Sequence, residues 1–113
     1  MLLKDLSETY FVKLKELNLQ YCYINDLSPL TSDTFKNLIF LNLQYNNIYD
    51  LNPLKYVKFL NIIEMFFGLN KIKDISPLKN CNFKRLRNIG FAGNPIAWDE
   101  ENRKIINNLL TRY

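Results

Sequence analysis

The residues of this chain that could support metal binding or catalysis are acidic side chains and cysteines, because the sequence contains no histidine. Asp26, Asp50 and Asp74 recur every 24 residues and could form a ladder of carboxylates, the ligand type that Ca²⁺ prefers. Each aspartate directly precedes an apolar residue. We therefore interpret the three carboxylates as acceptors for backbone amides in a repeated turn, and we predict no metal site.

Catalytic groups are equally sparse. Glu16 and Glu64 are the best candidate pair of carboxylates, but a sheet would hold them two strands, about 10 Å, apart, with no cleft to exclude water. Cys22 is expected to be buried and Cys81 to lie on the outer, convex side, and neither has a plausible base. The sequence also lacks a glycine-rich phosphate loop, so we predict that the protein is not an enzyme and uses no cofactor.

Length and composition favour one folded domain, since 113 residues at 48% hydrophobic can bury about 65% of the surface of the unfolded chain. A net charge of +4 and a pI near 9.1 are less basic than is typical of dedicated nucleic-acid-binding proteins.

The two cysteines are far apart in sequence, which favours reduced thiols. The segment MLLKDLSETY lacks the apolar run of a signal peptide or membrane span, so we expect a cytoplasmic protein with no membrane association.

Shifting the sequence by 24 residues reveals an internal repeat. The segments LKELNLQYCYINDLSPL, LIFLNLQYNNIYDLNPL, IIEMFFGLNKIKDISPL and LRNIGFAGNPI align without a gap, starting at residues 14, 38, 62 and 86. Apolar columns run through the alignment: Leu14/Leu38/Ile62/Leu86, Leu17/Leu41/Met65/Ile89, Leu19/Leu43/Phe67/Phe91 and Ile24/Ile48/Ile72/Ile96. A further column holds Phe11, Phe35, Phe59 and Phe83.

These columns resemble the leucine-rich repeat family, whose pattern L-x-x-L-x-L-x-x-N/C-x-L is met in all four copies over residues 11 to 96. The continuation N-x-I-x-D-L/I-x-P-L is most similar to the short repeats of bacterial internalins and of protein-phosphatase regulatory proteins. Each repeat here carries about two additional residues, in TSDT and KYVK. The resemblance implies an α/β solenoid with a parallel, concave sheet and a binding role.

The physical basis of one 24-residue coil can be stated from its residues. LKELNLQ alternates apolar and polar positions, which predicts a short strand with one buried face. Asn46, Asn70 and Asn94 follow the strands, where an amide side chain can bond to backbone groups that have no partner in the sheet. Prolines then set the turn of each returning arm, at positions 29, 53 and 77.

We therefore predict a single domain over residues 1–113, with four coils in 11–97 and a cap at each end. Residues 1–10 should form a partial, helical N-terminal cap with Leu3 and Leu6 facing the first coil. Residues 98–113 should form a C-terminal capping helix that begins at Asp99. Its apolar face, together with Trp98, should cover the last coil, and consists of Ile105, Ile106, Leu109 and Leu110.

Strand positions that are not needed for the core should face the concave side and contact a protein or peptide partner. Aromatic side chains there, ringed by amides, have the composition of an interface. The predicted partner-binding residues are Phe40, Phe66, Tyr21, Tyr45, Asn42, Gln44, Glu64 and Leu69, with Ile39 and Ile63 extending the surface at the rim. In the alternative interpretation, Phe40 and Phe66 only pack against each other across adjacent strands.

Two other functional classes stay open. A poorly covered first strand would favour self-association, or a chain that is part of a longer array, so we expect a monomer or a weak homo-oligomer. A basic edge could bind nucleic acid, which we treat as a minor alternative; it comprises Lys79, Lys84, Arg85 and Arg87. A regulatory role toward a phosphatase is implied by the resemblance alone.

Overall fold

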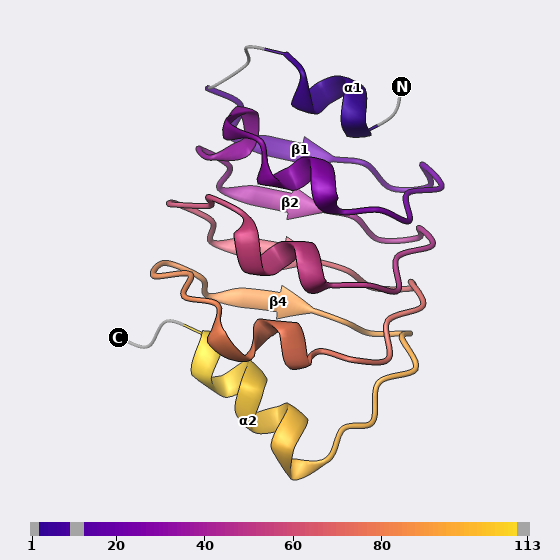
Figure 1. Ribbon diagram of the computed structural model, residues 1–113. Helices are drawn as coiled ribbons and strands as arrows, with labels where there is room; N and C mark the ends of the chain where they lie inside the picture. The colour runs from indigo at the N-terminus through magenta and orange to yellow at the C-terminus, as the bar shows by residue number, and fades with distance from the viewer. Residues whose placement is uncertain (1–2, 10–12, 111–113) are drawn as a thin grey trace.

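Four short parallel strands form the back of the molecule in the computed structural model, which describes residues 3–9 and 13–110. The strands are β1 (Glu16–Asn18), β2 (Phe40–Asn42), β3 (Glu64–Phe66) and β4 (Asn88–Gly90), and they are hydrogen-bonded in chain order (Figure 1). Paired residues such as Leu17 and Leu41 are 24 apart in sequence. This register confirms the predicted coil and the predicted α/β solenoid.

Short 3₁₀ helices form the opposite side of each coil (Figure 1). They are η1 (Ser28–Thr31), η2 (Asp33–Phe35), η3 (Asn52–Tyr56) and η4 (Ser76–Asn80). A proline occupies the first turn of η1, η3 and η4, where its fixed φ suits the turn and its missing N–H costs no hydrogen bond. The preceding aspartates accept from the backbone N–H two residues later, at 2.8 to 2.9 Å, as predicted.

The apolar core fills the space between the sheet and the 3₁₀ helices. The repeat columns are fully or nearly buried in the middle coils, for example Leu41, Met65 and Phe67 at 0% exposure. The first coil is less covered, and Leu14 and Leu19 are only partly buried. Phe35, Phe59 and Phe83 are buried as predicted, whereas Phe11 lies outside the described residues.

The predicted asparagine turns join each coil to the coil before it. Asn70 Oδ1 accepts from the N–H of Ile48 at 3.0 Å, and its Nδ2 donates to the carbonyl oxygens of Leu43 and Phe67, both at 2.9 Å. Asn46 and Asn94 repeat this arrangement one coil earlier and one coil later. Asn70 is 7% exposed, so water cannot replace these bonds.

A longer helix covers the last coil. Helix α2 (Glu100–Leu109) begins after Asp99, whose carboxylate accepts from the N–H of Asn102 at 2.9 Å, as the sequence predicted. Ile105 and Leu109 are buried and Ile106 is partly buried, so the predicted apolar face is confirmed. Leu110 packs against the same core but caps the helix instead of belonging to it. Trp98 contacts Phe91 with ring centroids 6.5 Å apart and remains 41% exposed.

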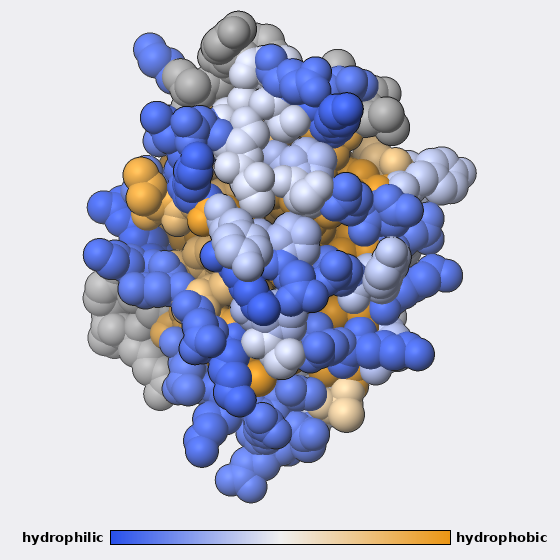
Figure 2. All heavy atoms as spheres, in the orientation of Figure 1, coloured by the Kyte–Doolittle hydropathy of each residue, from blue (hydrophilic) through white to orange (hydrophobic). Residues whose placement is uncertain are grey.

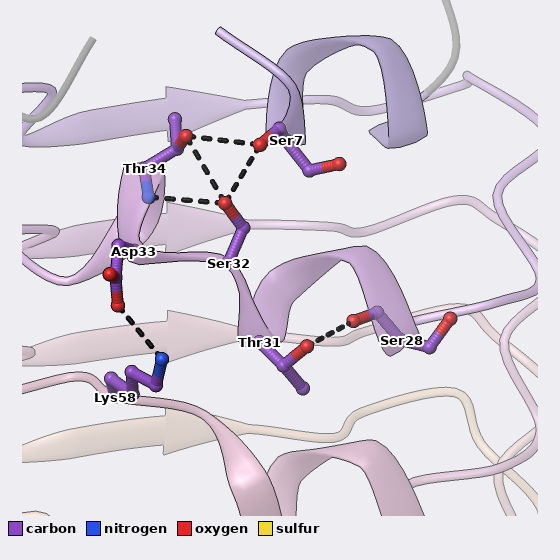
Figure 3. Close-up of polar contacts among 7 residues, drawn as sticks. All are labelled: Ser7, Ser28, Thr31, Ser32, Asp33, Thr34 and Lys58. Carbon is purple, nitrogen blue, oxygen red and sulfur yellow. Dashed lines mark hydrogen bonds and ion pairs between the residues drawn. The ribbon is translucent and has the colours of Figure 1, made fainter. Parts of the chain in front are cut away.

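A short helix covers part of the first coil. Helix α1 (Leu3–Ser7) buries Leu3 and packs against η1 and η2. Two hydroxyl groups hold it. Ser32 Oγ and Thr34 Oγ1 donate to the carbonyl of Ser7 at 2.7 and 3.1 Å (Figure 3). Thr34 Oγ1 also donates to the carbonyl of Thr9 at 2.7 Å. Both come from the TSDT segment. The residues that lengthen this repeat therefore attach the N-terminal helix.

Replacing Asn70 by alanine should lower the free energy of unfolding by about 3 kcal/mol, because one buried N–H and two buried carbonyl groups lose their partners. Urea unfolding followed by circular dichroism measures this change. The matched control is Asn47→Ala, since Asn47 is exposed in the equivalent turn of the preceding coil, and a loss below about 0.5 kcal/mol is expected there. Equal losses in the two variants would contradict the proposed role of the asparagine ladder.

Candidate functional site

Two phenylalanines meet on the outer face of the sheet. Phe40 on β2 and Phe66 on β3 are half-buried, and their ring centroids are 5.7 Å apart with planes tilted by 60°. The registers place Phe66 opposite Gly90, and its ring lies within 3.1 Å of where a Cβ on that glycine would sit. The missing side chain therefore lets the Phe66 ring lie along the sheet. The two rings pack against each other and also keep part of their surface open.

The amide residues on the same face are less available than predicted. Asn42 was expected to be free for a partner, but it is only 7% exposed. Its Oδ1 accepts from the backbone N–H and from Nε2 of Gln44, at 3.1 and 3.2 Å. Gln44 is half-buried and its side chain lies over Gly68. Asn42 thus orients Gln44, and Gln44 is the amide that a partner could reach.

Tyr21 and Tyr45 follow β1 and β2 and stack on each other. Their ring centroids are 4.5 Å apart with planes 16° from parallel, and the side chains remain 68% and 43% exposed. The N–H of Tyr21 donates to the carbonyl of Tyr45 at 3.1 Å, which fixes the spacing of the two rings. Partial removal of water around its hydroxyl, with Tyr45 as the next cause, raises the pKa of Tyr21 above its usual value. The raised pKa favours the neutral form of the Tyr21 hydroxyl.

The backbone beneath these tyrosines is left-handed. Tyr21 and Tyr45 have φ of 58°, Leu69 has 55°, and the same column ends in Gly93 at 79°. This conformation costs a side-chain-bearing residue about 1–2 kcal/mol, and glycine or asparagine is its usual occupant. The turn that leads to each asparagine requires the conformation, but it does not require a large side chain. Large exposed residues thus occupy positions where smaller ones would fold more easily.

Tyr23 belongs to the same surface and was not among the predicted binding residues. It is 85% exposed with φ of 56°, and with Tyr21, Tyr45 and Asn47 it lines a depression of about 150 Å³. Its place in the repeat was visible in the sequence. Its left-handed backbone was not, because the equivalent positions in the other coils, such as Asn47, do not have a positive φ. We use the term tyrosine cluster for Tyr21, Tyr23 and Tyr45.

The remaining candidate residues lie as follows. Glu64 is half-buried on β3, and Phe40 stands between it and Glu16 in the register of the sheet. Leu69 is 44% exposed next to Gly93. Among the described residues, no group of three or more cysteine or acidic side chains could hold a metal ion.

Cys22 departs from the prediction, because it is exposed. Its position matches the asparagines of the later coils, whose side chains bond backward to a preceding coil. In the first coil, Asn46 Oδ1 accepts from the backbone N–H of Cys22. The Cys22 thiol donates to the carbonyl of Gln20, in its own coil, at 3.3 Å. Cys81 is partly buried, and removal from water raises the pKa of its thiol.

The face that carries the 3₁₀ helices has a different character. It is covered mainly by hydrophilic side chains, with a paler band over the helices and smaller areas of apolar surface on either side of that band (Figure 2). No helix within the described ranges is long and apolar enough to cross a membrane. The clustered exposed aromatic side chains described above lie on the sheet face and at the ends of the strands.

Comparison with known proteins identifies the repeat. An internalin (inlF) from Listeria monocytogenes matches 94% of this chain at 27% sequence identity with a TM-score of 0.71. An internalin C2 (inlC2) from the same organism matches 85% of this chain at 30% identity with a TM-score of 0.67. The chain is a leucine-rich repeat protein. It spans 28% and 38% of the lengths of these two internalins. No protein-family model matches the sequence, and a search of curated proteins gives no match.

Within this leucine-rich repeat protein, Leu69→Asn should leave the free energy of unfolding unchanged or raise it by up to about 1 kcal/mol, because asparagine tolerates a positive φ. Thermal and urea unfolding measure the change. Leu60→Asn is the matched control, since Leu60 is 67% exposed and does not have a positive φ, so it gains no such relief. If Leu69→Asn instead loses more than about 1 kcal/mol, Leu69 is retained for packing and not for its exposed surface.

Proposed function

We propose that this leucine-rich repeat protein binds a protein or peptide partner through the sheet face and the adjoining tyrosine cluster. The observation that carries the proposal is the occupancy of left-handed positions by exposed Tyr21, Tyr23 and Tyr45. Asparagine or glycine would adopt this backbone at lower cost, and the stacking of Tyr21 on Tyr45 offsets only part of the difference. Residues that cost stability while exposing aromatic surface are typical of binding sites.

The geometry suits recognition by a preformed surface. Tyrosine has few rotatable bonds and offers both an apolar ring and a hydroxyl, so it loses little conformational entropy when it contacts a partner. The stacking of Tyr21 on Tyr45 already restricts both rings. The half-open pair of Phe40 and Phe66 adds apolar surface, while Gln44, Glu64 and Leu69 add polar and apolar contacts around it.

Several observations support a binding role over other functions. The likeness to the internalins supports a protein-interaction role in general. Both cysteines are free thiols, which supports the further proposal that the protein acts in the cytoplasm. The raised pKa of Cys81 argues against its use as a nucleophile, and the exposed Cys22 has no base among its hydrogen-bond partners.

A double substitution tests this proposal without unfolding the protein. Tyr21→Asn with Tyr45→Asn should reduce partner binding at least about tenfold, because two aromatic anchors are lost, while asparagine suits the left-handed backbone. Immobilised wild-type and variant proteins are compared for the partner that each retains, and the affinity of that partner is then measured by calorimetry. Phe40→Ala with Phe66→Ala forms a second arm, with a larger stability loss because the two rings contact each other.

The control is Tyr56→Ala, which removes a tyrosine of similar exposure, 70%, from η3 on the opposite side of the coil. It should leave binding unchanged. If Tyr56→Ala and the Tyr21/Tyr45 variant weaken binding equally, the sheet face and tyrosine cluster are not the binding surface.

Self-association is a second candidate, favoured by the ends of the sheet. Strands β1 and β4 are its two edges, and each pairs with a neighbour on one side only. The main contacts of α1 and α2 are with 3₁₀ helices, so both helices cover the opposite side of the end coils. An edge strand of one molecule could extend the sheet of another, head to tail.

Sedimentation velocity across a hundredfold range of protein concentration separates these roles. A binder of other proteins should sediment as a monomer throughout. Lys15 and Leu19 bond to β2, so by alternation the N–H of Asn18 faces the open edge of β1. Self-association predicts a sedimentation coefficient that rises with concentration and falls again in Asn18→Pro, because proline removes this edge donor. Circular dichroism of that variant checks that the remaining coils stay folded.

A further inference from the structure

The rim of the sheet at the amino ends of the strands carries a second surface, distinct from the tyrosine cluster. Lys13, Lys15, Asn61 and Arg85 line a depression of about 290 Å³, with Ile39 and Ile63 in its floor. The three basic side chains are exposed and the two isoleucines are half-buried. The positive charges therefore lie at the two ends of the depression, in the first and fourth coils. The second and third coils form its uncharged floor.

The backbone holds this rim in a fixed register. The N–H of Ile39 donates to the carbonyl of Lys15 at 2.7 Å, and the N–H of Ile63 donates to the carbonyl of Ile39 at 2.9 Å. The N–H of Arg87 continues the series to the carbonyl of Ile63, also at 2.9 Å. Because strands are about 4.8 Å apart, three steps separate the outer coils by about 14 Å. The two basic ends are thus set at a defined distance by the sheet.

The basic groups at the ends are available to a ligand. Within the described ranges, the ion pairs join Lys58 to Asp33 and Lys79 to Glu101, and neither involves Lys13, Lys15 or Arg85. An acidic ligand therefore does not have to displace an existing partner. Its carboxylates would gain charge-assisted hydrogen bonds from lysine or guanidinium groups.

We propose that this rim binds an extended acidic peptide whose two carboxylates lie over the basic ends and whose apolar centre rests on Ile39 and Ile63. An extended chain advances about 3.3 Å per residue, so side chains four residues apart are about 13 Å apart, close to the span of the rim. Two residues that are four apart also point to the same side of an extended chain. The ligand therefore carries an acidic residue, three residues with an apolar one at their centre, and a second acidic residue.

A peptide fits this rim better than a nucleic acid does. Glu16 and Glu64 directly follow Lys15 and Ile63 and face the outer side of the sheet. A phosphate backbone with a charge at every nucleotide would meet these carboxylates and the apolar floor. A peptide with charges only at its two ends keeps its carboxylates away from Glu64 and places an uncharged centre on the apolar floor.

The test uses a fluorescein-labelled peptide with two glutamates that flank three residues centred on leucine, titrated with the intact protein and read by fluorescence anisotropy. Saturable binding is expected, weakened about tenfold between 50 and 500 mM salt. Replacing the glutamates by glutamine, or the leucine by serine, should each reduce affinity. An unlabelled single-stranded oligonucleotide of equal charge should compete poorly.

Charge-reversal variants test whether the peptide binds at the rim. Lys15→Glu with Arg85→Glu should lower the affinity for the labelled peptide at least about tenfold, because both ends change from attraction to repulsion. Lys73→Glu with Lys104→Glu makes the same change in net charge at exposed sites elsewhere and should bind normally. The Tyr21→Asn, Tyr45→Asn variant should also bind the peptide normally, so the test does not depend on the proposed role of the tyrosine cluster.

Three outcomes would overturn the proposal: no saturable binding of the peptide, equal loss in the rim variant and in its charge-matched control, or effective competition by the oligonucleotide. The last result would assign the rim to nucleic acid instead. Circular dichroism melts of each variant confirm that altered binding comes from the rim and not from unfolding.

Discussion

The whole structure depends on the hydrogen bonds that join each coil to the one before it. The most specific of these bonds are made by the side chains of the asparagines in the turns. A coil of 24 residues cannot bury its own apolar face, so it is stable only when stacked on a neighbour. At the turn after each strand the backbone leaves the sheet while it is still inside the stack. Asn46, Asn70 and Asn94 supply the donors and acceptors that this point needs, and they reach carbonyl groups of two successive coils. Core packing then follows from the register that these bonds enforce.

Much of this could be predicted from the sequence, because the constraint repeats. Any residue type that the coil needs must recur every 24 positions, so Asn70, Asp74 and Pro77 could be assigned roles by comparison with their counterparts in the other coils. The parallel register followed from the same reasoning, whereas the C-terminal helix was predicted from its own cap at Asp99 and its own apolar face. What lacks a counterpart could not be predicted in this way. Cys22 was expected to be buried by analogy with the asparagines, yet it is exposed, and within the described residues no earlier coil stacks on the first one.

The candidate site was harder to predict than the fold, since its properties depend on neighbours across coils. Alternation placed Asn42 on the outer face correctly, but it could not show that Gln44 covers it. The left-handed backbone at Tyr21, Tyr45 and Leu69 was also invisible, because tyrosine and leucine are not residues that signal such a conformation. The extra residues in TSDT gave no sign of their role either. Ser32 and Thr34 acquire it only when α1 packs beside them.

The same constraint explains why two different surfaces can lie on so small a protein. A stack held in register fixes the distance between equivalent positions of successive coils, so each column becomes a row of side chains at regular spacing. The column after the strands holds the stacked tyrosines and ends in Gly93, which makes an aromatic surface on the first two coils. The column before the strands begins with Lys15 and ends with Arg87, with isoleucines between them. Neither column supplies fully buried core side chains, so substitutions that suit the local backbone change the surface more than the coil. The fold thus separates the residues that determine stability from those that can determine binding.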